Sequence, residues 1–149
     1  MAGDKKEAEA ARVRTYGGLA TEERRRARYE ALIAAGIELI GTVGYEATTI
    51  RAVCTEASLT ERYFYESFEN REALLAAVYE NLIEEANRRT LAAAERALAL
   101  AENTGKRDPV ALAREAFTAF FEFNEDPRVA RILMREVLGV SPQIDALYR

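Results

Sequence analysis

The sequence predicts an all-α protein. Good helix formers, alanine above all, dominate the 149 residues, and only three prolines and eight glycines interrupt them. Apolar residues make up 49% of the chain, recur at helical spacing and suffice to bury a core at this length. We therefore expect a small helical domain that shares a helix with a second one.

Residues 1–20 are predicted to form a flexible N-terminal arm, because they contain few large apolar side chains and include the breaker pair Gly17-Gly18. The first helix is expected to begin at Thr21, whose side chain suits an N-cap. It is expected to end before Gly44, since glycine favours the left-handed conformation found after helix ends.

Two short helices are predicted next. Thr48 is the expected N-cap of the first, and Thr60 is the expected N-cap of the second. One face of the first is apolar and consists of Ile50, Val53, Cys54 and Ala57. Three helices, of which the last two are short and only about three residues apart, are the parts of a helix-turn-helix. In that motif one helix enters the major groove of DNA and another packs behind it.

A long helix is predicted from Asn70, its expected N-cap, through residues 71–102, which contain neither proline nor glycine. Asp108-Pro109 and Asp126-Pro127 each place a capping aspartate before a proline, so each predicts a further helix. Ser141-Pro142 opens another helix that runs straight into the end of the chain, which suggests a truncated domain.

The predicted fold is thus all-α in three parts. A flexible arm over residues 1–20 precedes a three-helix helix-turn-helix domain over residues 21–70. The long helix joins it to a partial helical domain over residues 71–149.

The residue types argue against an enzyme. The chain has no histidine, its single cysteine (Cys54) falls on an apolar helix face, and no glycine-rich phosphate loop or metal-ligand cluster is present. We therefore expect no catalytic residue, no metal and no cofactor, and a buried structural thiol rather than a redox sensor. The lone cysteine, the lack of a membrane-length apolar run and the lack of a basic amphipathic helix predict a cytoplasmic protein.

Several short motifs follow one another at fixed spacing between Arg28 and Tyr79. They are an alanine-rich first helix, Gly44-Tyr45, Thr48-Thr49-Ile50, Leu59-Thr60, Tyr65, Phe68 and the run Asn70-Arg71-Glu72-Ala73-Leu74-Leu75. In this order they resemble the N-terminal DNA-binding domain of TetR-type repressors. The resemblance implies a homodimer that binds double-stranded operator DNA with one recognition helix per half-site. It also implies a helical ligand-binding and dimerisation domain. Binding of a small-molecule effector to that domain would shift the two DNA-binding domains of the dimer.

The resemblance also implies which residues meet DNA. By position, Thr49 and Tyr65 match phosphate-contacting residues, and Arg71 matches a basic phosphate contact. Arg62 lies on the recognition helix and is the predicted base reader, because a guanidinium can bridge O6 and N7 of guanine. The complete set of predicted DNA-binding residues is Thr49, Arg51, Thr60, Arg62, Tyr63, Tyr65, Arg71 and Arg28.

Charge and one turn residue depart from this pattern. The net charge is −4, and residues 46–72 contain six glutamates but only three arginines. Positive charge gathers instead over residues 24–28, which we expect to supply much of the salt-dependent affinity, although a solvated helix end is the alternative. Ser58 stands where the family usually has glycine. A positive φ there would cost serine on the order of 1 kcal/mol.

Six side chains are predicted to line a pocket for the effector, with plain core as the alternative reading of their helical spacing. They are Tyr79, Ile83, Phe117, Phe120, Phe121 and Met134. The rival function is a helical protein-interaction module without DNA binding, which the acidic net charge and the long amphipathic helix favour. Salt-dependent binding to duplex DNA separates the two functions.

Overall fold

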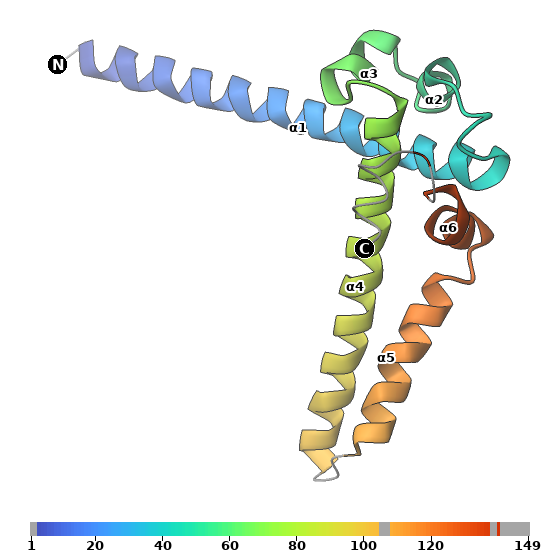
Figure 1. Cartoon of the computed structure of the whole chain (residues 1–149). Coiled ribbons are helices and arrows are strands. Elements are labelled where there is room, and N and C mark those ends of the chain that lie inside the picture. The colour runs from blue at the N-terminus through green and yellow to red at the C-terminus, as the bar shows by residue number, and fades with distance from the viewer. Residues whose placement is uncertain (1–2, 105–107, 138–139, 141–149) are drawn as a thin grey trace.

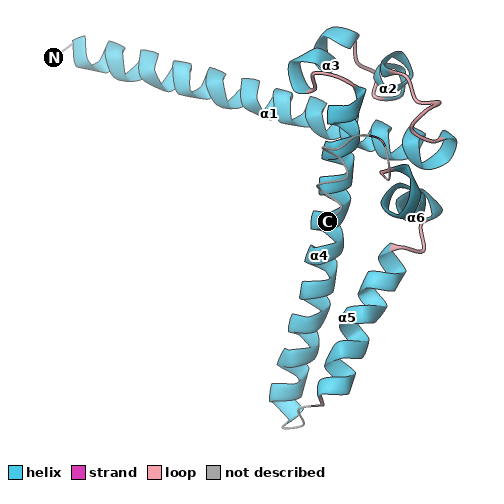
Figure 2. Ribbon diagram, in the orientation of Figure 1, coloured by secondary structure: helices cyan, strands magenta, loops and turns pink. Residues whose placement is uncertain are grey.

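The computed structural model describes the backbone of residues 3–104, 108–137 and 140, and the side chains of residues 20–102, 108–137 and 140. Every regular element in these residues is helical, as predicted (Figure 2). The elements are α1 (Gly3–Val43), α2 (Ile50–Glu56), α3 (Glu61–Ser67), α4 (Arg71–Thr104), α5 (Pro109–Phe123), α6 (Pro127–Arg131) and a π-helical segment, η1 (Ile132–Glu136). Among the described residues, no helix is both long and apolar enough to cross a membrane.

The helices form a head and a hairpin (Figure 1). The head, residues 28–79, contains the C-terminal part of α1, both short helices and the first turns of α4. From the head, α4 runs away and α5 returns beside it, and α6 then lies against α1. The hairpin therefore leads the chain back to the head.

The N-terminal part of α1 differs from the prediction. The predicted helix start at Thr21 is wrong, because α1 begins at Gly3, continues through Gly17-Gly18 and projects beyond the head (Figure 1). Residues 5–12 are all lysine, glutamate, alanine or arginine. Such good helix formers offset the roughly 1 kcal/mol that each glycine costs within a helix. The flexibility of the arm stays a prediction.

The start of α2 also moves by one residue. Thr48, the predicted N-cap, is only 1% exposed, and its Oγ1 donates a 2.8 Å hydrogen bond to the Gly44 carbonyl. Thr49 is the N-cap instead, since its hydroxyl accepts a 3.1 Å hydrogen bond from the Ala52 amide. The first threonine therefore fixes the loop and the second fixes the helix. As predicted, α1 ends just before Gly44, which has a φ of 93°.

The predicted helix starts at Asn70, Asp108 and Asp126 are confirmed. The Asn70 side chain accepts a 2.8 Å hydrogen bond from the Ala73 amide in the first turn of α4. Asp108 and Asp126 each cap a helix that begins with proline. The helix predicted from Ser141-Pro142 lies outside the described residues.

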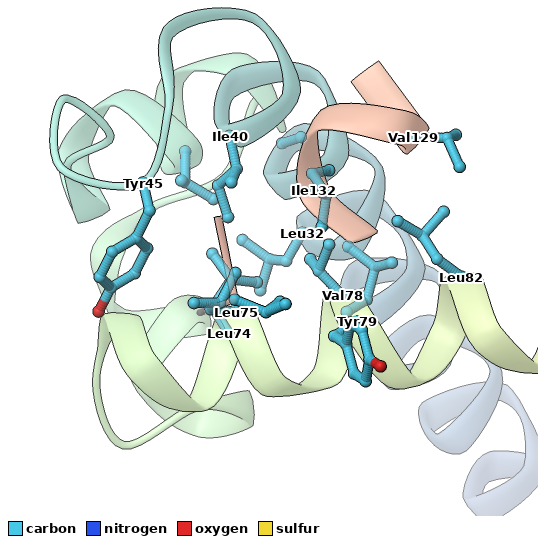
Figure 3. Close-up of a cluster of buried hydrophobic side chains, with 14 of the residues drawn as sticks. Leu32, Ile40, Tyr45, Leu74, Leu75, Val78, Tyr79, Leu82, Val129 and Ile132 are labelled. Carbon is cyan, nitrogen blue, oxygen red and sulfur yellow. The ribbon is translucent and has the colours of Figure 1, made fainter. Parts of the chain in front are cut away.

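One core joins the head to the returning chain (Figure 3). Its fully buried side chains come from α1 to α4, η1 and the residue after η1, and include Leu32, Ile40, Val53, Phe64, Leu74, Leu75, Val78, Ile132 and Val137. Burial of a side chain of this size contributes about 1.5–3 kcal/mol. The two regions predicted over residues 21–70 and 71–149 therefore share one core, and η1 is held against the head.

Candidate nucleic-acid interface

The turn between α2 and α3 has a defined hydrogen-bond pattern. The Leu59 amide donates to the Cys54 carbonyl at 2.8 Å, and the Ser58 amide donates to the Thr55 carbonyl at 3.1 Å. These two bonds are the Schellman pattern that ends helices with a left-handed residue. Ser58 has that conformation, with a φ of 54°, so serine bears the strain of about 1 kcal/mol expected at this position.

Helix α3 has a buried side and an exposed side. Phe64 is completely buried, and its ring lies 5.6 Å from that of Phe68. The residues on the opposite side are exposed and occupy four positions of one helical face: Glu61, Arg62, Tyr65 and Glu66. Because Phe64 anchors the short helix in the core, its polar face is held outward.

Arg62 and Tyr65 are two large exposed side chains of this face. The Arg62 side chain is 84% exposed, and its Nε lies 3.2 Å from a Glu66 carboxylate oxygen. Tyr65 is 58% exposed. A surface ion pair of this kind is worth at most about 1 kcal/mol, so phosphate or a base can displace it. Both side chains are therefore accessible to a partner.

Tyr63 and Arg28, also predicted to bind DNA, contact each other instead. The Arg28 guanidinium carbon lies 4.4 Å from the centroid of the Tyr63 ring. Arg28 also approaches the Glu66 carboxylate at 3.7 Å, and its side chain is only 24% exposed. This geometry gives the two residues a positioning role, because they tie α1 to α3.

Arg71, the predicted phosphate contact on α4, is also occupied within the protein. Its Nη1 donates hydrogen bonds to the carbonyls of Tyr45, Glu46 and Thr48, at 3.1, 3.2 and 2.7 Å. Its guanidinium carbon lies 4.4 Å from the centroid of the Tyr45 ring. Arg71 therefore holds the loop before α2 rather than pointing away from the protein.

The remaining predicted DNA contacts are exposed. Thr49 lies at the N-terminus of α2 and Arg51 in its first turn. Thr60 is the N-cap residue of α3, but its side chain makes no capping hydrogen bond. Five of the eight predicted residues are therefore accessible to a partner, namely Thr49, Arg51, Thr60, Arg62 and Tyr65.

The arginine cluster before Arg28 is exposed on α1, as predicted, and each of its members has a neighbour on the same helix. Arg26 pairs with Glu30 at 2.8 Å, and Arg25 pairs with Glu22 at 3.8 Å. Arg24 Nη2 donates a 3.4 Å hydrogen bond to the Thr21 hydroxyl. These guanidinium groups therefore add positive charge beside a head that is acidic overall.

A second contact on the loop before α2, not predicted from the sequence, is made by Glu136 of η1. One Glu136 oxygen accepts a 2.7 Å hydrogen bond from the Tyr45 amide, and the other accepts from Arg131 Nε at 2.8 Å. Arg131 Nη1 in turn donates to the Thr42 carbonyl at 2.7 Å. Burial raises the pKa of the Glu136 carboxyl, but the Tyr45 amide, Arg131 and Arg135 outweigh burial and hold the pKa below its ordinary value.

Two features explain why this contact was missed. Glu136 and Tyr45 are 91 positions apart in the sequence, so no local pattern links them. Arg131 and Glu136 are five residues apart, whereas side chains that meet on an α-helix are three or four apart. The π-helical turn brings residues at the wider spacing together.

A cleft of about 560 Å³ opens between α4 and α5 at the end of the hairpin away from the head. Alanines at every fourth position of α4, Ala93, Ala97 and Ala101, form one wall, and Leu112 of α5 contributes to the other. Arg96, Asp108 and Glu115 add charged groups. The cleft is mainly apolar, as small-molecule sites generally are.

None of the six residues predicted to line an effector pocket lines this cleft. Tyr79 is 8% exposed and belongs to the core shown in Figure 3. The other five are exposed on the outer surfaces of the helices and η1: Ile83, Phe117, Phe120, Phe121 and Met134. Their role in binding an effector stays a prediction.

The described residues contain no group of histidine, cysteine, aspartate and glutamate side chains that is suited to hold a metal ion. Cys54 is 3% exposed, which confirms its predicted buried position. Burial, and secondarily the Glu61 carboxylate, raises the pKa of the Cys54 thiol. The thiol is therefore protonated and unreactive at neutral pH.

Comparison with known proteins gives the same picture of the head. Residues 32–78 match the family of bacterial regulatory proteins described as the tetR family. A TetR family transcription regulator from Marinobacter aquaeolei VT8 shares the fold, with a TM-score of 0.69 over 85% of this chain and 19% sequence identity. This chain spans 63% of the length of that regulator. Curated protein sequences gave no match.

The family match begins in α1, covers α2 and α3, and ends in the first turns of α4, so it coincides with the head that presents Arg62 and Tyr65. The shared fold extends beyond it into the hairpin. The head therefore matches the model of the tetR family of bacterial regulatory proteins, and the chain as a whole shares the fold of a TetR family transcription regulator.

Proposed function

We propose that this regulator binds double-stranded operator DNA through α3 and represses transcription there. The observation that carries the proposal is the division of α3 into a buried side anchored by Phe64 and an exposed polar side containing Arg62 and Tyr65. A helix held in this way fits the major groove, which is about 12 Å wide. A protein that occupies the operator would exclude the transcription machinery from it.

The exposed residues divide by the kind of contact that they would make. Arg62 is the base reader, since its guanidinium matches the acceptor pair of guanine. Tyr65 and Thr49 would donate to phosphate oxygens and fix the register of the helix. Arg24, Arg25 and Arg26 supply the non-specific term, which depends on salt because phosphate contacts release bound cations.

The proposed regulator is a homodimer whose binding is released by a small effector. Two copies would place their α3 helices in successive major grooves, about 34–36 Å apart, on a pseudo-palindromic site. The α4–α5 cleft supports an effector that is mostly apolar with one or two charged groups. Such a ligand would favour hairpin positions in which the two heads fit DNA poorly.

The test starts from random duplexes selected for binding to the wild-type chain. Arg62→Ala is expected to weaken binding to the selected sequence by about 1–3 kcal/mol and to relax its sequence preference. Tyr65→Ala should weaken binding to all duplexes alike. The matched control is Arg114→Ala, which removes an exposed arginine from α5 and should leave affinity unchanged. Unchanged affinity in both head variants would exclude α3 as the DNA-binding element.

The outer face of α5 favours a second candidate function, a helical protein-interaction module. Val110, Phe117 and Phe121 are each more than 60% exposed and lie on the side opposite Ala116 and Phe123, which face α4. A helix that is apolar on both sides is normally covered on both. Salt distinguishes the candidates, because DNA binding weakens steeply as salt rises whereas apolar association does not.

A further inference from the structure

The loop between α1 and α2, residues 44–49, is held from two sides by the part of the chain outside the helix-turn-helix. On one side, Arg71 of α4 donates to the Tyr45 carbonyl at 3.1 Å. On the other side, Glu136 of η1 accepts from the Tyr45 amide at 2.7 Å. Both backbone groups of one residue are therefore bound by side chains from different helices.

This loop decides where α2 begins. Thr48, fully buried in the loop, donates to Gly44, and its own carbonyl accepts the shortest of the Arg71 hydrogen bonds, at 2.7 Å. The next residue, Thr49, caps α2. Since α2 packs against α3, a shift of Tyr45 changes the orientation of the helices proposed to meet DNA.

Helix α6 lies close against the end of α1 and the start of this loop, and Gly41 permits the approach. A Cβ atom at Gly41 would lie 2.8 Å from the Arg128 Cα, so the backbone of α6 would have to shift to admit it. At Gly44 a Cβ atom would lie 2.6 Å from Arg131 Nη2, and the φ of 93° favours glycine there as well. An ion pair between Arg128 and Glu38 adds another contact between α6 and α1.

We propose that Glu136 is a positioning residue through which η1 sets the α1–α2 loop and, through it, the angle of α2 and α3. The inference rests on the proposed DNA-binding function and deepens it. Arg131 aligns the Glu136 carboxylate, which accepts the hydrogen bond from the Tyr45 amide. Because a hydrogen bond weakens steeply with distance, a small displacement of η1 releases the amide while the apolar core stays packed.

The experiment uses the full chain and two readouts. Hydrogen exchange of the Tyr45 amide, followed by NMR, reports whether the loop is held. Affinity for a duplex selected with the wild type reports the position of the helices. Glu136→Ala is expected to speed exchange of the Tyr45 amide and to weaken DNA binding, each by about tenfold, as the loss of one charge-assisted hydrogen bond predicts.

Two further variants separate reach from charge and keep the test decisive if Glu136→Ala does not fold. Glu136→Gln keeps an oxygen acceptor for the Tyr45 amide but turns an amide nitrogen toward Arg131 Nε, so both readouts should lie between those of the wild type and of Glu136→Ala. Glu136→Asp keeps the charge but is one methylene shorter. It should therefore lose the Tyr45 hydrogen bond and behave like Glu136→Ala.

The matched control is Val129→Ala, which removes a buried side chain from α6 but leaves Glu136 and Arg131 in place. It should lower thermal stability yet leave DNA affinity within about twofold, since the loop contacts persist. Equal affinity losses in Val129→Ala and Glu136→Ala would overturn the inference, because the effect would then be general destabilisation. Wild-type protection of the Tyr45 amide in Glu136→Ala would overturn it too.

The two proposals fail in different ways. A folded wild-type chain that binds no duplex at any salt concentration overturns the proposed function, and this inference with it. A wild type that binds its selected duplex, together with a Glu136→Ala variant that binds it equally well, overturns this inference alone.

Discussion

The outer face of α3 and the loop before α2 both contain residues that the family resemblance assigns to DNA, but their polar groups are occupied differently. On α3, Arg62 is 84% exposed and has one ion-pair partner on the same helix. At the loop, Arg71 of α4 donates to three loop carbonyls and lies over the Tyr45 ring. The first region can exchange its partners for a ligand, whereas the second cannot do so without loosening the fold.

The difference follows from backbone groups rather than from residue type. Residues 44–49 leave α1 and have not yet entered α2, so several carbonyls lack a helical partner, and a guanidinium with five donors satisfies them. The residues of α3 satisfy their own backbone, so Arg62 extends into solvent. An arginine near a helix start thus binds the protein where nearby backbone carbonyls lack a hydrogen-bond partner, and it stays available to phosphate where they do not.

Within α3, the buried Phe64 and the exposed Arg62 should differ most in their contribution to stability. Phe64→Ala removes a completely buried ring and should lower the free energy of unfolding by about 3–5 kcal/mol. Arg62→Ala, two residues away, should change it by less than about 0.5 kcal/mol, because a surface ion pair is lost. Urea unfolding measures both. Similar losses in the two variants would contradict the division of α3 into buried and exposed sides.

Arg71 supplies the next largest effect. Arg71→Ala leaves part-buried carbonyls of the loop without a donor and should cost about 2 kcal/mol of unfolding free energy, together with DNA affinity. Arg71→Lys keeps the charge but not the planar set of donors. Its unfolding free energy and its DNA affinity should therefore lie between those of the wild type and those of Arg71→Ala. If thermal and urea unfolding show full stability in Arg71→Ala while only DNA binding is lost, Arg71 belongs with Arg62.

Ser58 offers a gain in stability. Because its φ is 54°, Ser58→Gly should raise the free energy of unfolding by up to about 1 kcal/mol, visible as a higher melting temperature. Ser58→Ala, which retains a Cβ, is the control and should give no gain. The turn is exposed, so neither variant disturbs the core. A melting temperature that falls in Ser58→Gly would contradict the strain assigned to this turn.

A fall in pH should remove the stabilisation that the Glu136 carboxylate gives to the α1–α2 loop. This change in unfolding free energy should be the smallest of those predicted, because burial of the carboxylate opposes the effect of its hydrogen bonds on the pKa. The folded-state pKa of Glu136 is lowered, so its contribution is present above the unfolded value of about 4.3 and disappears as pH falls below it. Unfolding free energies measured down this range should fall less steeply in Glu136→Gln than in the wild type. Parallel curves would contradict a stabilising carboxylate at this position.

Local signals in the sequence predicted the helices well and their ends less well. The three caps confirmed at Asn70, Asp108 and Asp126 each have one suitable residue at the boundary. Thr48 and Thr49 are both suitable, and only tertiary packing decides that the first is buried. The start of α1 was mispredicted because a glycine pair costs too little to end a helix of strong formers.

The candidate site was predictable where exposure follows from helical periodicity and not where it follows from long-range contacts. Burial of Phe64 between exposed Arg62 and Tyr65 can be read from spacing alone. The contacts of Glu136 with Tyr45 and of Arg28 with Tyr63 join distant segments, which spacing does not reveal. On α5 apolar residues lie on both sides, so periodicity gives no choice between core and surface.

The exposed aromatic side of α5 also affects the solubility of the protein at high concentration. Phe117 and Phe121 each keep 63% of their surface in water. At high protein concentration these rings can pack against those of other molecules. Concentrated solutions are therefore expected to aggregate and become turbid. Sulfate or phosphate should increase the turbidity, and cooling should reduce it, because both are known to change the strength of association through apolar surface in these directions.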